Sequence, residues 1–92
     1  MPKAIHSARH KRLTELLIAQ RRQAGMTQAQ VAKALGRHQP VIANIEKGER
    51  RLDIVELLDL AEILGLDLHA VIEQLKGIPS AADLNRKRGK AP

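Results

Sequence analysis

The chain has 92 residues, contains no cysteine and no aromatic residue, and carries a formal net charge of +6. Its length allows one small domain, and the lack of cysteine excludes disulfides and thiolate metal sites, as in many proteins of a reducing cytoplasm. Without aromatic side chains the chain lacks the stacking platforms of single-strand and RNA binders, and its core must be aliphatic.

Charge is distributed unevenly along the chain. Residues 1–51 hold eleven Lys or Arg and three acids, whereas residues 52–75 hold six acids and no Lys or Arg. Residues 76–92 hold five basic residues and one acid. The first half therefore has the excess positive charge that neutralises DNA phosphates, and the acidic segment would be repelled by them.

The first predicted helix runs from about His10 to Ala24 and ends at Gly25. Residues 1–9 are predicted to form a flexible basic arm, although Ser7 could cap an earlier start of the helix. The inward-facing residues are Leu13, Leu16 and Leu17.

Two short helices with a tight turn between them are predicted between Thr27 and Gly48. Thr27 is a good N-cap, because its hydroxyl can accept a backbone N–H of the first turn. Gly36 stands where a left-handed residue ends a helix, and Pro40 suits the first turn of the next one. The inward residues are Val31, Ala32 and Leu35, then Ile42 and Ile45, which leaves Gln39, Val41 and Asn44 outward. Two helices with so short a join must cross, as in a helix-turn-helix that places its second helix in the major groove of DNA.

Two further helices and a tail complete the prediction of an all-α fold. The fourth helix opens with D-I-V-E at residues 53–56, a capping-box-like pattern, and ends at Gly65. The fifth opens at Asp67 and runs to about Lys76. Its buried positions are expected to be Leu68, Val71, Ile72 and Leu75. Residues 77–92, with their R-K-R-G-K run, are predicted to be a disordered basic tail.

The order and spacing of these motifs resemble the Cro/xenobiotic-response-element (XRE) type of helix-turn-helix family over residues 12–76. The shared elements are Arg21, T-Q-x-x-[LV]-A at Thr27 to Ala32, Leu35–Gly36, I-x-x-[IL]-E-x-G at Ile42 to Gly48, G-E-R-R at Gly48 to Arg51, and L-L-x-L-A-x-x-L-G at Leu57 to Gly65. The resemblance implies a compact five-helix, lambda-repressor-like DNA-binding domain over residues 10–76, with the second and third helices as the helix-turn-helix.

The resemblance also implies which residues read DNA bases. The expected set is Gln39, Pro40, Val41 and Asn44. Gln and Asn amides can pair bidentately with adenine, and Val41 can touch a thymine methyl. Pro40 departs from the small polar residue usual in the family, which puts direct readout there in doubt. The alternative is an exposed polar face that contacts no base.

A second set is expected to bind phosphates. Gln28 lies at the start of the second helix, where free N–H groups favour an anion, and in the family the matching residue braces the first residue of the third helix, here Gln39. The other expected members are Arg37, His38, Lys47, Arg50 and Arg51. Some of these could be ordinary surface charges. His38 replaces the frequent Ser or Thr N-cap, so the third helix should begin less firmly.

A third group is structural. The resemblance implies a largely buried ion pair between Arg21 on the first helix and Glu46 near the end of the third, which fixes the pose of the third helix. The alternative is a loose surface pair, which would contribute less than about 1 kcal/mol.

The fourth helix has more apolar residues than one core face needs. Its acids fall on every third residue, at 53, 56, 59 and 62, and nearly everything between them is apolar. The surplus indicates a second partner, either the fifth helix or a symmetric subunit, and the candidates for a homodimer interface are Val55, Leu58, Ile63 and Leu66. A fully buried central helix is the alternative. The family usually reads inverted repeats as two-fold dimers, which favours the homodimer.

From these features we predict sequence-specific binding of double-stranded DNA by a dimeric transcriptional regulator. A repressor that reads an inverted-repeat operator is the preferred form of this function. The alternative is an antitoxin that binds a toxin protein and autoregulates its operon, with the tail or the acidic segment as its docking surface.

No enzyme, cofactor or metal site is predicted. His6 and His10 have an i, i+4 spacing that can suit a metal, but a basic arm is the preferred interpretation. No P-loop, G-x-S-x-G or H-E-x-x-H motif occurs. No apolar run approaches the roughly 18 residues of a spanning helix, so we expect a cytoplasmic, nucleoid-associated protein.

Overall fold

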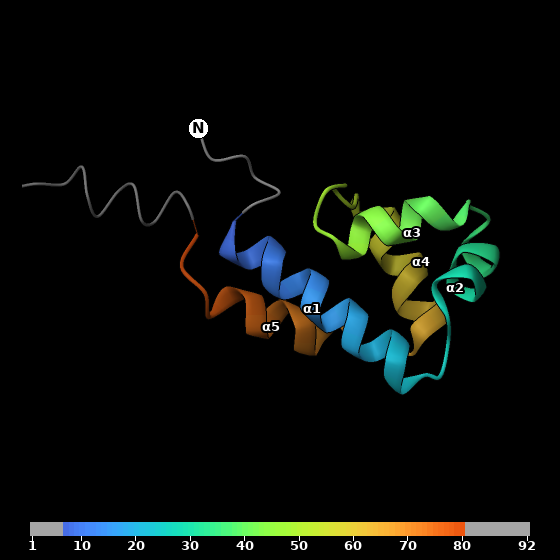
Figure 1. Ribbon diagram of the computed structural model, residues 1–92. Coiled ribbons are helices and arrows are strands. Elements are labelled where there is room, and N and C mark those ends of the chain that lie inside the picture. Colours follow the sequence, from blue (N-terminus) through green and yellow to red (C-terminus); the bar gives the residue numbers. More distant parts are fainter. Residues whose placement is uncertain (1–6, 81–92) are drawn as a thin grey trace, which may run out of the picture.

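The computed structural model describes residues 7–80, which form five helices and, within that range, no strand (Figure 1). The helices are α1 (Ala8–Gln23), α2 (Gln28–Leu35), α3 (Gln39–Glu46), α4 (Ile54–Leu64) and α5 (Leu68–Lys76). The predicted all-α, five-helix fold is confirmed.

Both ends of the described chain differ from the prediction. α1 begins at Ala8, two residues before the expected His10, because the Ser7 side chain caps it by accepting a hydrogen bond from the His10 N–H at 3.1 Å. At the other end, Arg9 Nε donates to the Ile78 carbonyl at 2.8 Å and ties the chain beyond α5 to α1. The rest of the expected arm and tail, including His6 and the R-K-R-G-K run, lies outside the described residues.

The caps of α2 and α3 explain why the turn between them is so short. Thr27 forms a capping box with Gln30, and Gly36 ends α2 with a φ of +75°. That left-handed residue lets the Arg37 N–H donate to the Ala32 carbonyl at 2.9 Å, so the helix ends there and the chain turns directly toward α3. His38 makes no side-chain cap on α3, which begins instead with Pro in its first turn.

The core is one aliphatic cluster to which all five helices contribute. In Figure 1, α1 and α5 lie side by side, and α3 lies on the opposite side of α1 from α5. α2 packs against both α3 and α4. The most buried members are Leu13, Leu17, Val31, Ala32, Ile42, Ile45, Leu60, Leu64 and Val71. α3 therefore contacts the core only through its inner face and leaves its outer face to solvent.

One predicted core position is wrong. Ile72 on α5 is 46% exposed, whereas its neighbour Val71 is 3% exposed. α5 packs against α1, and its core-facing stripe consists of Val71 and Leu75, four residues apart. Ile72 lies about 100° around the helix from Val71 and therefore points away from that stripe.

The acids that recur at every third residue of α4 do not all face solvent. Glu56 is buried, because it lies four and eight residues before Leu60 and Leu64 and so shares their core-facing side. The surplus apolar residues lie elsewhere on the same helix: Ile54 and Val55 are 63% and 62% exposed.

Candidate nucleic-acid interface

The outer face of α3 carries most of the residues predicted to read bases. Gln39, Pro40 and Asn44 are exposed there. Val41 was expected to point outward as well, but it is half-buried and packs against the core, so only part of its side chain can meet a ligand. The fully exposed part of the predicted base-reading set is therefore two amides with a proline between them.

The ion pair between Arg21 and Glu46 is present and is bidentate. Arg21 Nε donates to Glu46 Oε2 at 2.6 Å, and Nη2 donates to Oε1 at 3.0 Å. A third bond, from Arg21 Nη1 to the Met26 carbonyl at 2.9 Å, holds the loop before α2. The side chains are only 14% and 10% exposed. Hydrogen bonding to Glu46 raises the pKa of Arg21 above its usual range, so the guanidinium stays charged.

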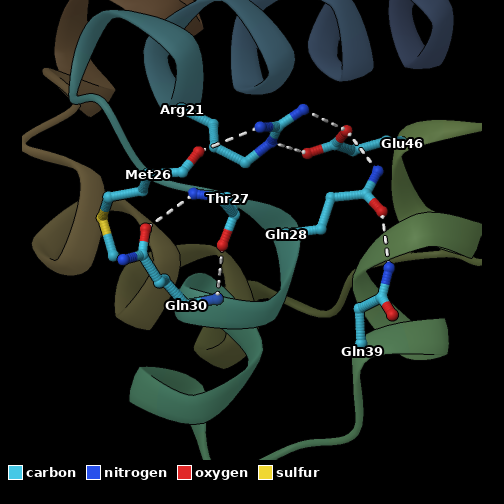
Figure 2. A network of polar contacts seen from close by, with 7 residues as sticks. All are labelled: Arg21, Met26, Thr27, Gln28, Gln30, Gln39 and Glu46. Atoms are coloured by element: carbon cyan, nitrogen blue, oxygen red, sulfur yellow. Dashed lines mark hydrogen bonds and ion pairs between the residues drawn. The ribbon is translucent and has the colours of Figure 1, made fainter.

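A chain of hydrogen bonds leads from this ion pair to the exposed start of α3 (Figure 2). Gln28 Nε2 donates to Glu46 Oε1 at 2.9 Å, and Gln39 Nε2 donates to Gln28 Oε1 at 3.0 Å. An ionised carboxylate only accepts, so Gln28 must turn its NH₂ group toward Glu46 and its oxygen toward Gln39. Gln39 must then donate inward. Its Oε1 and second N–H are left for an external partner, and that pair of groups matches the edge of adenine.

A second carboxylate, that of Glu56, binds two of the expected phosphate-binding residues, and this contact was not predicted from the sequence. Glu56 accepts a bond from Arg37 Nη2 at 2.9 Å and a bidentate pair from Arg50 at 3.1 and 2.9 Å. These bonds from Arg50 are the main reason that the pKa of Glu56 lies below its ordinary value of 4.5. The sequence did carry one indication of it: Glu56 lies four residues before the core residue Leu60, so both share the inward side of the helix.

The other expected phosphate-binding residues lie on the surface. His38, Lys47 and Arg51 are exposed, on the turn before α3 and the loop after it. Arg51 borders a shallow hollow with Ser7 and Arg9, so it also lies beside the start of α1.

The four candidates for a homodimer interface fall into two groups. Val55 and Leu58 are 62% and 47% exposed, so their side chains are accessible on α4. Ile63 and Leu66 are half-buried and pack against the core, which leaves little of their surface for another chain. Ile54, which was not among the candidates, is exposed next to Val55.

Two findings concern other kinds of site. Among residues 7–80, no group of three or more His, Cys, Asp or Glu side chains is placed to hold a metal ion. Within the same range, none of the helices combines the length and the apolar character needed to cross a membrane.

Truncation of Arg21 tests the buried pair. Arg21→Ala leaves the Glu46 charge buried without its main partner, at a cost of about 3–5 kcal/mol in unfolding free energy. For a domain of this size we expect the Tm to fall by about 12 °C or more. Thermal unfolding followed by circular dichroism measures it. Arg22→Ala, at the exposed neighbouring position, is the matched control, and an equal Tm for the two variants would contradict a buried pair.

The Glu56 cluster predicts a specific pH dependence. A carboxyl group with a lowered folded pKa contributes stability above its unfolded pKa, and that stability is lost as pH falls through the folded pKa. At neutral pH, Glu56→Gln should cost about 1–3 kcal/mol, because charged hydrogen bonds are lost. The difference in unfolding free energy between wild type and Glu56→Gln should shrink as pH is lowered below 4.5. Urea unfolding at a series of pH values checks this, and a constant difference would refute it.

Comparison with known proteins agrees with this geometry. Residues 17–71 match the helix-turn-helix family model HTH_3. Among solved structures, an XRE-family like protein from Pseudomonas syringae pv. tomato str. DC3000 is similar to this chain, with 38% sequence identity and a TM-score of 0.69. The similarity covers 76% of this chain and 88% of that one. No curated protein matches the chain. The matched residues include α2, α3 and α4 together with the residues that orient α3. The chain therefore belongs to the Cro/XRE-type helix-turn-helix family of DNA-binding transcription regulators.

Proposed function

We propose that this protein is a dimeric repressor that recognises an inverted-repeat operator by inserting α3 into the major groove. It would act in the cytoplasm on nucleoid DNA. Gln39 and Asn44 read bases, and Pro40 and the accessible part of Val41 contact the groove wall. Gln28 and the exposed basic residues of the flanking loops meet phosphates. The second helix of a helix-turn-helix enters the groove with its first residues against base edges, which matches the position of Gln39.

The orientation of the Gln39 amide is the observation that supports this proposal most strongly. Its inward N–H is bonded to Gln28 at 3.0 Å, and Gln28 is bonded to the ion-paired Glu46. A side chain held in this way loses less conformational freedom on binding, and its remaining donor and acceptor are already oriented. A solvated glutamine with no reading role would not need this support.

The exposed apolar face of α4 supports a second copy of the chain as the partner. Leu58 lies four residues after Ile54 and three after Val55, so the three exposed side chains form one patch near the start of the helix. A two-fold axis brings the same patch of each copy together, which buries all six side chains at once. Two copies arranged in this way would present two α3 helices to half-sites one DNA turn apart.

Substitution of the reading residues tests the function. Fluorescence anisotropy compares binding to the DNA upstream of the protein's own gene with binding to a scrambled duplex, at about 150 mM salt, where nonspecific binding is weak. We expect a preference of at least about a hundredfold. Gln39→Ala and Asn44→Ala should each lose about 1–3 kcal/mol of discrimination, since each removes a bidentate base contact.

Gln23→Ala, at an exposed position at the end of α1, is the control for this experiment. It should bind both duplexes as the wild type does. Equal binding of the two duplexes by the wild type would leave only a general DNA grip, or an operator elsewhere. Selection of duplexes from a random pool separates these outcomes, because a general grip enriches no sequence.

The oligomeric state tests the α4 patch. The wild type should sediment as a dimer at high micromolar concentration, and Leu58→Lys should shift it toward monomer, because a charge replaces apolar contact on both sides of the axis. Ile72→Lys, at a similarly exposed position on α5, is the matched control. A wild-type monomer in analytical ultracentrifugation would refute the dimer. A dimer that dissociates with Ile72→Lys instead would move the interface to α5.

A further inference from the structure

Glu56 connects the two segments that flank α3. Arg37 lies two residues before the first residue of α3, Gln39, and Arg50 lies four residues after the last, Glu46. Both arginines donate to the same carboxylate at the start of α4. One buried acid therefore holds the chain where it enters α3 and again where it has left it.

The two arginines are held differently. Arg50 uses both of its Nη atoms on Glu56, and Nη1 also donates to the Arg51 carbonyl at 3.3 Å. Arg37 gives Glu56 a single bond, from Nη2. Its side chain is 45% exposed against 31% for Arg50. Of the five N–H groups of Arg37, four have no acceptor among the described residues, so this side chain is equipped for a further partner.

The charges of the cluster add to one positive unit. The bidentate pair between Arg50 and Glu56 is internally neutral and mostly shielded, because the Glu56 side chain is only 10% exposed. The remaining positive charge is that of Arg37, at the surface beside the start of α3. An arginine with unused donors and a fixed position is well suited to a phosphate oxygen.

We propose that Glu56 is a positioning residue for DNA binding: it holds Arg37 against one backbone phosphate beside the base pairs that Gln39 reads. Arg50 is an internal brace of the cluster and makes no phosphate contact of its own. This inference rests on the proposed function and assigns different roles to two arginines that the sequence suggested were equivalent.

Salt dependence separates the two arginines. The probe is a duplex selected from a random-sequence pool by the wild-type protein, with a scrambled duplex beside it. Anisotropy titrations over a series of salt concentrations give the slope of log K against log salt, which falls by about one for each lost phosphate contact per bound chain. Arg37→Ala should reduce the slope by about one for each bound chain, and Arg50→Ala should leave it unchanged. A loss of slope in Arg50→Ala as large as in Arg37→Ala would overturn the assignment.

A double-mutant cycle tests whether Glu56 acts through Arg37. Glu56→Gln keeps a residue that suits the third position of a capping box, so α4 should still form. It should weaken binding about tenfold in the wild-type background and less than about twofold in the Arg37→Ala background, since coupled neighbours are not additive. Glu62→Gln removes an exposed acid of the same helix and controls for the change in net charge. Tighter binding by Glu56→Gln, or the same loss in both backgrounds, would refute the positioning role.

The outcomes also distinguish this inference from the proposed function. If Glu56→Gln fails to fold, as judged by circular dichroism, the slopes of Arg37→Ala and Arg50→Ala still decide the inference. If the wild type binds selected and scrambled duplexes equally, the repressor proposal fails, and the cycle is measured on the scrambled duplex instead. If the wild type binds neither duplex, both proposals are refuted.

Discussion

The position of α3 depends on one buried negative charge, that of Glu46. An ionised carboxylate in a poorly hydrated site must be surrounded by donors, because the cost of leaving it unpaired is several kcal/mol. Arg21 from α1 and Gln28 from α2 supply them. Since the amide of Gln28 is thereby fixed, its oxygen can only accept, and Gln39 at the start of α3 provides the donor. A single charge thus orders side chains from three helices.

This arrangement compensates for a small hydrophobic contribution from α3 itself. The helix has eight residues, of which Ile42 and Ile45 are buried, and an isolated helix of that length is unstable in water. With no aromatic residue in the chain, the core cannot hold α3 by a large ring. Two ion pairs hold α3 instead. Glu46 at its end pairs with Arg21 of α1, and Glu56 of α4 pairs with Arg50 in the loop that follows α3. The outer face of α3 is left exposed for binding, and the charges of Glu46 and Glu56 on the inner side hold the helix in place.

The sequence predicts the elements of this fold well because their signals are local. N-caps such as Thr27 and glycines such as Gly36 act within one turn, so they can be recognised without knowing the tertiary structure. The pair between Arg21 and Glu46 joins residues 25 apart, and only the resemblance to a family implied it. The burial of Glu56 follows from how α4 packs, and the exposure of Ile72 from how α5 packs. Neither follows from local propensity, although the spacing of Glu56 from Leu60 was a signal of its burial.

The dependence of α3 on Glu46 is tested most directly by hydrogen exchange of its backbone amides. Glu46→Gln removes the charge but keeps the length of the side chain, and Glu62→Gln removes an exposed charge on α4 as a control. We predict that Glu46→Gln lowers the protection of α3 amides more than that of α1 and α5 amides, which follow only the global loss of stability, and that Glu62→Gln changes none of them. Unchanged protection of α3 in Glu46→Gln would show that the apolar contacts of Ile42 and Ile45 hold the helix alone, which would contradict the account given above.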